Sequence, residues 1–262
     1  MRSGKTKRNL AYAALAIASI IVLSYLAFFF SSQPSNSPSN PPLQPSTAPL
    51  KAAIVDQLGI HSPNQSFTNT ATNILTQAGY TVDYYEWNEA TVNCFRNLAT
   101  HGYALIILRT HSAVVEAEPN YVCIFTSEPF NETKHHSEWT SGYLGRARYF
   151  TNETDYYFAI TPRFVQYSMK GTFENTTIIM MGCDGLTHTN MAEAFIRRGA
   201  EAYVSWDGPV LTSHTDTATS NLLKHLVTEE QTVPSAVAET MQEVGADPIY
   251  LADLAFYPHE RS

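Results

Sequence analysis

Two short apolar runs constrain the fold of this chain more than any other feature of its sequence. Ala104–Leu108 (ALIIL) and Thr177–Met181 (TIIMM) have the length of single strands and contain no charged residue. Strands that are apolar on both faces are typical of a parallel sheet covered by helices on both sides. The two runs therefore predict a sheet buried between two layers of helices.

The segments around these runs alternate between strand and helix patterns. Ala52–Asp56 (AAIVD) predicts a strand, and the apolar residues from Phe67 to Ala78 recur at helical spacing before Gly79. Further strands are predicted at Thr81–Trp87 and Ala202–Trp206, and further helices at Met191–Arg198, around Leu222–Leu226 and from Pro234 to Val244. This order predicts an α/β fold, an α/β/α sandwich with a mostly parallel central sheet. Residues 112–173 show no clean periodicity and are expected to form an insertion of hairpins and loops.

The amino terminus predicts a membrane anchor. Residues 10–30 carry no charge, and a helix of this length spans about 31 Å, which matches the hydrocarbon core of a bilayer. The basic residues of the tail 1–9 are expected to stay in the cytoplasm, which places the rest of the chain outside the cell. A cleaved signal peptide, which would give a secreted protein, is the alternative. The anchor is favoured because the run is long and ends in Phe28–Phe30, with no small-residue cleavage site directly after it.

A proline- and serine-rich linker at 31–50 follows and separates the anchor from a domain at 51–262. Six of its twenty residues are proline and six are serine, a composition typical of an extended stalk. Asn-X-Ser/Thr sequons in the domain fit an exported, glycosylated protein. These sequons begin at Asn64, Asn131, Asn152 and Asn175.

The charge balance argues against nucleic acid as a partner. The chain has 16 basic and 24 acidic residues, and four of the basic ones lie in the first nine positions. The remaining chain therefore carries 12 basic and 24 acidic residues, a net charge of −12, which repels polyanions. Hydrophobic residues make up 44% of the 262 residues, enough for a substantial core.

Reactive residues follow the predicted strands directly. Asp56 ends the first strand, His111 follows ALIILRT, Cys183 follows TIIMMG, and Asp207 follows AYVSW. Ligands of open parallel sheets bind beyond the carboxyl ends of the strands, where these residues would gather. A thiol and an imidazole at that edge can form a nucleophile–base pair. Gly182 allows close backbone approach, with amide groups able to hold an oxyanion.

The segments LIILRTHS and TIIMMGCDGLTHTNMAEAFIRRGAEAYVSWDGPV resemble the caspase-like cysteine peptidases, in particular the gingipain and CHAT branch. The resemblance covers residues 51 to about 245. It implies that His111 is the general base and Cys183 the nucleophile, with Ser112 and Gly182 at the oxyanion site. Ser112 stands where the family usually has glycine.

The resemblance also implies a substrate-binding role for Trp206 and Asp207, with Asp56 as a further candidate. A carboxylate at Asp207 would favour Arg or Lys before the scissile bond. In an oxidising exterior, Cys94 and Cys123 are expected to pair and leave Cys183 free.

Neither a metal nor another cofactor is expected. The histidines that could join Cys183 in a metal site lack ligand spacing; they are His135, His136, His188 and His214. The leading hypothesis is therefore a membrane-anchored endopeptidase acting on a peptide or protein substrate. The alternative is a non-catalytic binding or adaptor domain with the same fold.

Overall fold

The computed structural model describes residues 50–149 and 154–258. The chain divides into two units, Met1–Ala48 and Pro49–Ser262, and the described residues all belong to the second. The predicted membrane anchor at 10–30 and the sequon at Asn152 lie outside the described residues. Within the described ranges, none of the helices combines the length and the apolarity of a bilayer-crossing segment.

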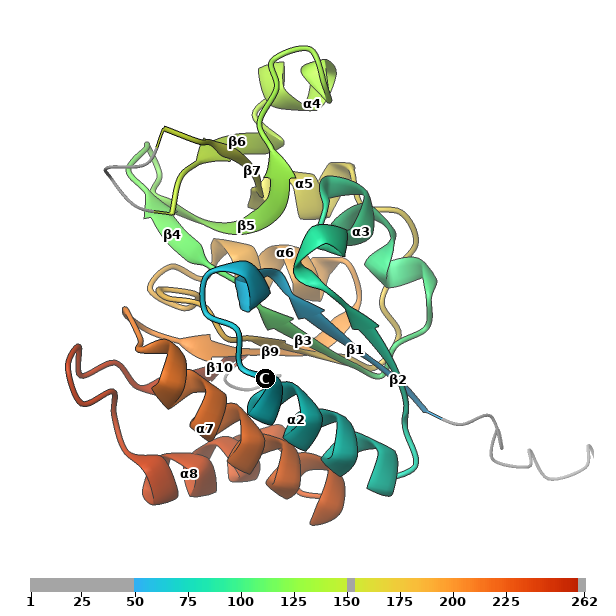
Figure 1. The fold of residues 1–262 in the computed structure, drawn as a ribbon, viewed down its shortest axis with the longest axis vertical. Helices are drawn as coiled ribbons and strands as arrows, with labels where there is room; N and C mark the ends of the chain where they lie inside the picture. The colour runs from blue at the N-terminus through green and yellow to red at the C-terminus, as the bar shows by residue number, and fades with distance from the viewer. Residues whose placement is uncertain (1–49, 150–153, 259–262) are drawn as a thin grey trace, which may run out of the picture. The chain divides into compact units, whose positions relative to one another are not determined.

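The core of the second unit is a six-stranded sheet in which five strands are parallel (Figure 1). Its strand order is β10-β9-β8-β3-β1-β2, and only the edge strand β10 runs antiparallel. The strands are β1 (Lys51–Asp56), β2 (Thr81–Tyr85), β3 (Leu105–Arg109), β8 (Thr176–Met180), β9 (Ala200–Trp206) and β10 (Leu254–Tyr257). The prediction of a mixed α/β fold with a mostly parallel central sheet is confirmed, and β10 is a strand that the sequence pattern did not indicate.

Helices α2 (Gln65–Gln77), α7 (Thr212–Leu223) and α8 (Val233–Val244) cover one face of this sheet (Figure 1). Side chains that alternate along β1, β3 and β8, such as Ile54, Ile107 and Ile179, pack against them. A π-helical turn, η4 (Lys224–Thr228), links α7 to the loop before α8. Three short 3₁₀ segments occur earlier in the chain: η1 (Gln57–Ile60), η2 (Trp87–Glu89) and η3 (Leu98–Thr100).

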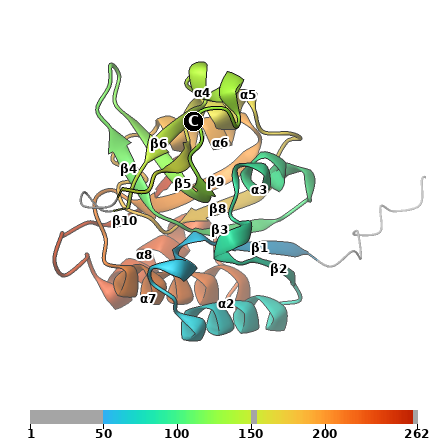
Figure 2. The same ribbon diagram turned by 45° about the horizontal axis from the view of Figure 1, so that its top comes forward.

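The opposite face is covered by α3 (Val92–Asn97), α5 (Pro162–Tyr167), α6 (Asn190–Arg197) and a second sheet. Ile106, Met180 and Tyr203 point into this layer, where Phe95 and Phe195 are fully buried. Figure 2 shows the second sheet on the side of α5 and α6, away from α7 and α8. The central sheet therefore lies between two layers, as its apolar strands require.

Residues 112–173, expected to be hairpins and loops, contain a regular four-stranded antiparallel sheet in the order β4-β5-β7-β6. Its elements are β4 (Ser112–Val115), β5 (Tyr121–Pro129), α4 (His136–Thr140), β6 (Leu144–Ala147) and β7 (Tyr157–Ile160). The sequence pattern did not indicate the individual strands because three of them have only four residues, too few for a clear alternating pattern.

The predicted disulfide between Cys94 and Cys123 is not formed, and both thiols are free. Cys94 lies on α3 and packs on the core beneath the second sheet. Side chains alternate along β5, so Val122 and Ile124 enter that core while Cys123 faces the other side of the second sheet with Phe125. The alternation of β5 thus turns the Cys123 thiol away from the core that holds Cys94.

Candidate active site at the carboxyl edge of the central sheet

The segments that carry His111 and Cys183 leave neighbouring parallel strands in register. Leu108 of β3 pairs with Met180 of β8, and the amide of Met181 donates to the carbonyl of Leu108 at 2.9 Å. His111 lies three residues after Leu108, and Cys183 lies three residues after Met180. The sheet therefore delivers an imidazole and a thiol to adjacent positions on one edge.

Close packing joins these two segments. The Ser112 hydroxyl donates a hydrogen bond to the carbonyl of Cys183. A Cβ atom on Gly182 would lie 2.3 Å from Ser112 Oγ and 2.5 Å from the carbonyl oxygen of Thr110. Only glycine fits at position 182 without displacing its neighbours.

The thiol of Cys183 is directed toward the loop after β9. Its sulfur accepts a hydrogen bond from the amide of Val210 at 3.4 Å and lies 3.6 Å from the Val210 carbonyl, to which it can donate. Burial raises the pKa of the Cys183 thiol, the Val210 amide opposes this, and the carboxylates of Asp184 and Asp247 raise the pKa further. The thiol is therefore protonated at neutral pH.

The imidazole of His111 lies among aromatic rings. Its centroid is 5.2 Å from that of Tyr149 and 6.0 Å from that of Phe125, and its backbone amide donates to Gln57 Oε1 at 2.9 Å. Burial, together with the nearby His61 and Arg109, lowers the pKa of His111 to about 4. The ring is therefore neutral at pH 7, as a general base must be.

Neither group hydrogen-bonds the other in the described structure. The thiol is held by Val210 and packs toward the layer of α2, α7 and α8, whereas the imidazole contacts Tyr149 and Phe125. The fold brings their backbones together but leaves the side chains pointing to different surroundings. Productive chemistry requires the thiol or the ring to reorient.

Arg109, which sequence analysis did not single out, anchors this edge. Its fully buried guanidinium donates to Asp56 Oδ1 at 2.8 Å and to both oxygens of Asp216 at 2.8 and 2.9 Å. A further hydrogen bond of 2.8 Å reaches the carbonyl of Ser62. This network ties β1 and β3 to α7, two residues before His111.

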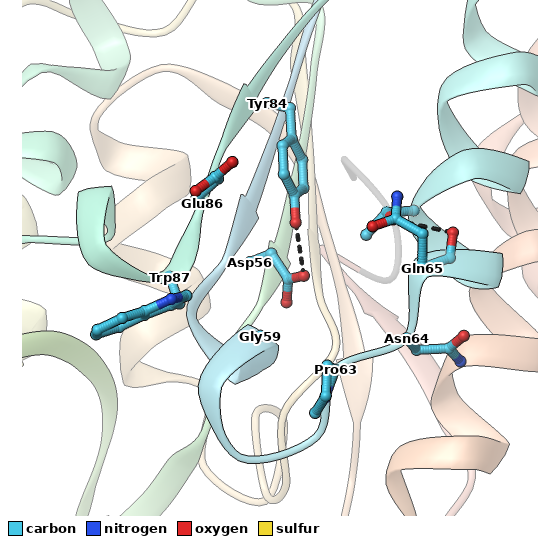
Figure 3. Close-up of a pocket in the computed structure, with 9 residues that line it drawn as sticks. Asp56, Gly59, Pro63, Asn64, Gln65, Tyr84, Glu86 and Trp87 are labelled. Carbon is cyan, nitrogen blue, oxygen red and sulfur yellow. Dashed lines mark hydrogen bonds between the residues drawn. The ribbon is translucent and has the colours of Figure 1, made fainter.

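Asp56 therefore has a structural role in addition to any contact with substrate. Its second oxygen accepts from the Tyr84 hydroxyl at 2.9 Å, so both oxygens are engaged. Asp56 also lines a cavity of about 200 Å³, where Trp87 and Glu86 lie on one side of it and Gln65 on the other (Figure 3). This cavity combines acidic and aromatic side chains.

The two residues predicted at the substrate pocket differ in accessibility. Trp206 is fully buried and its indole donates to Thr215 Oγ1 at 2.9 Å, so it is part of the core and presents no surface to a peptide. Asp207 is exposed, and its Oδ1 accepts from the amide of Asp253 at 2.8 Å. Of the two, only Asp207 is open to a substrate side chain.

Asp207 lies beside the loop that carries Cys183. The Thr187 hydroxyl donates to the carbonyl of Asp207 at 2.7 Å, and the amide of Asp184 donates to the carbonyl of Gly208 at 2.8 Å. Two carboxylates, those of Asp184 and Asp207, therefore border the loop of the thiol. Their charge suits a cationic partner.

The asparagines of the described sequons differ in how free their side chains are to carry a glycan. Asn131 and Asn175 are exposed. Asn64 caps α2 by accepting from the amide of Phe67, and its Nδ2 donates to Asp216 at 2.9 Å. A glycan on Asn64 would compete with that hydrogen bond.

The histidines considered for a metal site have separate partners. His135 contacts Glu128, the His136 ring faces the Glu132 carbonyl, and His214 faces the Gly245 carbonyl. Among the described residues, a group with the spacing of metal ligands occurs elsewhere, at His225, Glu229 and Glu239. The sequence signal that could have found it is the spacing of four between His225 and Glu229.

No protein-family model and no curated protein matches the sequence. A comparison with solved structures finds similarity to gingipain R, an Arg-specific cysteine proteinase, with a TM-score of 0.41 and 13% identity. The match covers 74% of this chain and 42% of that chain, so this chain spans less than half of the gingipain R chain. At this TM-score the similarity assigns neither a fold family nor an activity.

Proposed function

We propose that the chain is a cysteine endopeptidase with a caspase-like fold, in which Cys183 is the nucleophile and His111 the general base. The observation that carries the proposal is the matched register of β3 and β8, which places the two residues side by side at the carboxyl edge of the sheet. A hydrogen bond from the Ser112 hydroxyl to the carbonyl of Cys183 joins the two segments that carry them. A sheet edge that served only for packing would not require a thiol and a neutral imidazole at matching positions after two neighbouring strands.

The chemistry proceeds through an acyl-enzyme. His111 takes the thiol proton as Cys183 Sγ attacks the carbonyl carbon of the scissile peptide bond, and the negative charge moves to the carbonyl oxygen. The tetrahedral intermediate collapses, the C–N bond breaks, and the imidazolium gives its proton to the leaving amine. Water, deprotonated by the same imidazole, then hydrolyses the thioester and releases the acid and the free thiol.

Two backbone amides are proposed to stabilise the oxyanion, those of Ser112 and Gly182. The amide of Gly182 donates to the thioether sulfur of Met180 at 3.0 Å. A thioether is a weak acceptor, so an oxyanion can replace it at little cost. The pairing of Ser112 with Ile124 in the β4–β5 ladder fixes the backbone at the other position.

A basic side chain before the scissile bond is the proposed specificity. Asp207 is exposed and adjoins the Cys183 loop, and Asp184 is close enough to raise the pKa of the thiol. A guanidinium bound there would offset the carboxylates and lower the pKa of Cys183. Substrate binding would thus assist ionisation of the nucleophile.

The proposal includes the location of the enzyme. Residues 10–30 would anchor it in the cell membrane as a single span, with the domain outside. The uncharged run and the basic tail before it support this placement.

Hydrolysis of a peptide library by the full chain tests the proposed activity. We expect cleavage by the wild type and a loss of at least roughly 10³-fold in Cys183→Ala and in His111→Ala, because the two groups act as a unit. Cys183→Ser is the matched control for the shape of the site. Unchanged turnover in both alanine variants would refute the assignment.

The rival function is a binding domain without turnover. One observation favours it: the thiol is held by Val210 while the imidazole is surrounded by Tyr149 and Phe125. A wild-type chain that cleaves no member of a broad library, but binds basic peptides in an Asp207-dependent way, would support this alternative.

A further inference from the structure

A second cluster of chemically active side chains lies between η4 and α8, apart from the residues of the sheet edge. His225 is its centre, with a side chain that is only 3% exposed. Its Nδ1 lies 2.9 Å from Glu229 Oε2 and 3.5 Å from Glu239 Oε2, and its Nε2 lies 3.3 Å from Glu243 Oε2. One imidazole is therefore surrounded by three carboxylates.

The helical geometry produces this convergence. His225 and Glu229 are four residues apart around the π-helical turn η4, and Glu239 and Glu243 are four apart on α8, so each pair shares a face. π-Helical turns are rare and occur frequently at functional sites. The backbone is fixed by hydrogen bonds from the Glu229 amide to the Lys224 carbonyl and from the Gln231 amide to the His225 carbonyl, each 3.0 Å.

One buried polar atom of this cluster, Oε1 of Gln231, makes no hydrogen bond. Nε2 of His225 lies 3.3 Å from Glu243 Oε2 but does not have the geometry of a regular hydrogen bond. Gln231 uses its other amide atom to donate to Glu229 and Glu239 at 3.1 and 2.8 Å. A buried polar atom without a partner is uncommon and calls for a ligand or a different protonation pattern.

The three glutamates of the cluster also have few positively charged partners. Lys224 is the one lysine or arginine that pairs with it in the described structure, at 3.4 Å from Glu229. The chain contains a useful comparison at His135, which contacts Glu128 and Glu138. There each carboxylate has its own cation, Lys134 for Glu128 and Arg96 for Glu138.

We propose that His225 Nδ1, Glu229 and Glu239 bind one divalent transition-metal ion of the zinc type. One oxygen from each glutamate and the imidazole nitrogen all lie within 4.8 Å of one another, a spacing that three ligands of one ion can reach with small side-chain shifts. Glu243 would accept a hydrogen bond from Nε2–H and orient the ring, as outer carboxylates do for metal-bound histidines. Gln231 would orient the two glutamates.

The donor set selects the class of metal. Ca²⁺ and Mg²⁺ prefer oxygen ligands alone, whereas an imidazole nitrogen favours zinc and similar ions. Three protein ligands leave a fourth position of a tetrahedral ion for water. The ion would link the end of α7 to α8 and stabilise this part of the fold.

Calorimetric titration of the full chain with ZnCl₂, after removal of metal with EDTA, tests the proposal. We expect one equivalent of Zn²⁺ to bind and to raise Tm, with Mg²⁺ and Ca²⁺ binding at least tenfold more weakly. Glu239→Gln and Glu229→Gln should each weaken binding by roughly tenfold or more. Both residues are accessible enough for the variants to fold, so the test does not depend on a substitution of buried His225.

Two controls separate this site from the rest of the chain. Glu138→Gln alters the neutralised cluster at His135 and should leave zinc affinity unchanged. Cys183→Ser removes the thiol of the proposed peptidase and should also leave one equivalent bound. Absence of zinc binding, unchanged affinity in Glu239→Gln and Glu229→Gln, equal affinity for Ca²⁺, or loss of binding in Cys183→Ser would each overturn the proposal.

Discussion

At the scale of single residues, Arg109 has the clearest physical role in the candidate site. Its guanidinium is buried, and its hydrogen bonds to Asp56, Asp216 and the Ser62 carbonyl satisfy it from three sides. The paired carboxylates and their hydrogen bonds raise the pKa of Arg109 against the opposing effect of burial, which is the largest single contribution. An ion network of this kind is costly to break because the remaining charge stays buried.

Asp216→Asn should therefore destabilise the protein by about 3 to 5 kcal/mol. The matched control is Glu193→Gln, which removes a helical ion pair between Glu193 and the exposed Arg197 and should cost less than about 1 kcal/mol. Urea unfolding measures both. Equal, small effects would show that the Arg109 network does not hold the sheet edge.

His111 predicts a specific dependence of stability on pH. Its folded-state pKa of about 4 lies below the ordinary value of 6.5, so the unfolded chain binds the proton more tightly. The neutral ring makes its full contribution to the free energy of unfolding above pH 6.5, and this contribution is lost as pH falls toward 4. Between pH 7 and 5 the wild type should lose about 1 to 2 kcal/mol more than His111→Gln.

Unfolding free energies of the two chains at pH 7, 6 and 5 measure this difference, and the other histidines cancel in the comparison. Parallel curves would mean that the His111 ring is not desolvated. The same pKa predicts that peptide hydrolysis continues into mildly acidic solution, because the base stays neutral there.

At the scale of elements, the two loops that leave β3 and β8 form the candidate site. Their contact depends on Gly182, whose missing Cβ leaves room for Ser112 and Thr110. The Cys183 loop is bonded in turn to the loop after β9 through the Val210 amide. Three neighbouring parallel strands thus position one thiol.

Gly182→Ala should disrupt this contact. The new methyl group would push the Ser112 hydroxyl away from the carbonyl of Cys183 and lower the free energy of unfolding by about 1 to 3 kcal/mol. The rate of peptide hydrolysis should fall by more than this loss of stability explains. Gly145→Ala in β6 is the control, because its Cβ would have ordinary contacts of 3.8 and 3.9 Å with Ala159. Wild-type activity in Gly182→Ala would contradict the proposed arrangement.

The sequence predicted the elements with local signals and missed those without them. Ala104–Leu108 and Thr177–Met181 are apolar on both faces, so their central place in the sheet could be inferred. The strands β4, β6 and β7 have four residues each. They gain stability from pairing, β4 and β7 with the longer β5 and β6 with β7. Such pairing is a non-local effect that periodicity does not encode.

The same distinction applies to the candidate site. The positions of His111, Cys183 and Asp207 after strands are local features and could be predicted from the sequence. The buried partners of Arg109 could not, because Asp216 is 107 residues away. Trp206 was assigned to the pocket from a resemblance, whereas strand alternation places its indole in the core against α7.

At the scale of the whole molecule, the uncharged run at residues 10–30 and the basic residues before it bear on where the chain resides. If residues 10–30 anchor the chain with the domain outside, protease added to intact cells should remove the domain and leave the amino-terminal tail protected. Immunoblotting with tags at both ends measures this. Protection of the domain would reverse the orientation, and a mature chain beginning after residue 30 would replace the anchor with a cleaved signal.

In the proposed mechanism, His111 activates Cys183 toward a substrate carbonyl. The most direct test of this mechanism is covalent labelling of the full chain with a peptidyl ketone that carries arginine before an electrophilic carbon, followed by peptide mass spectrometry. We expect one adduct per chain, on Cys183, with labelling slowed by roughly tenfold or more in His111→Ala and in Asp207→Asn. Labelling of Cys94 or Cys123 instead, or labelling of Cys183 at the same rate in wild type and His111→Ala, would contradict the mechanism.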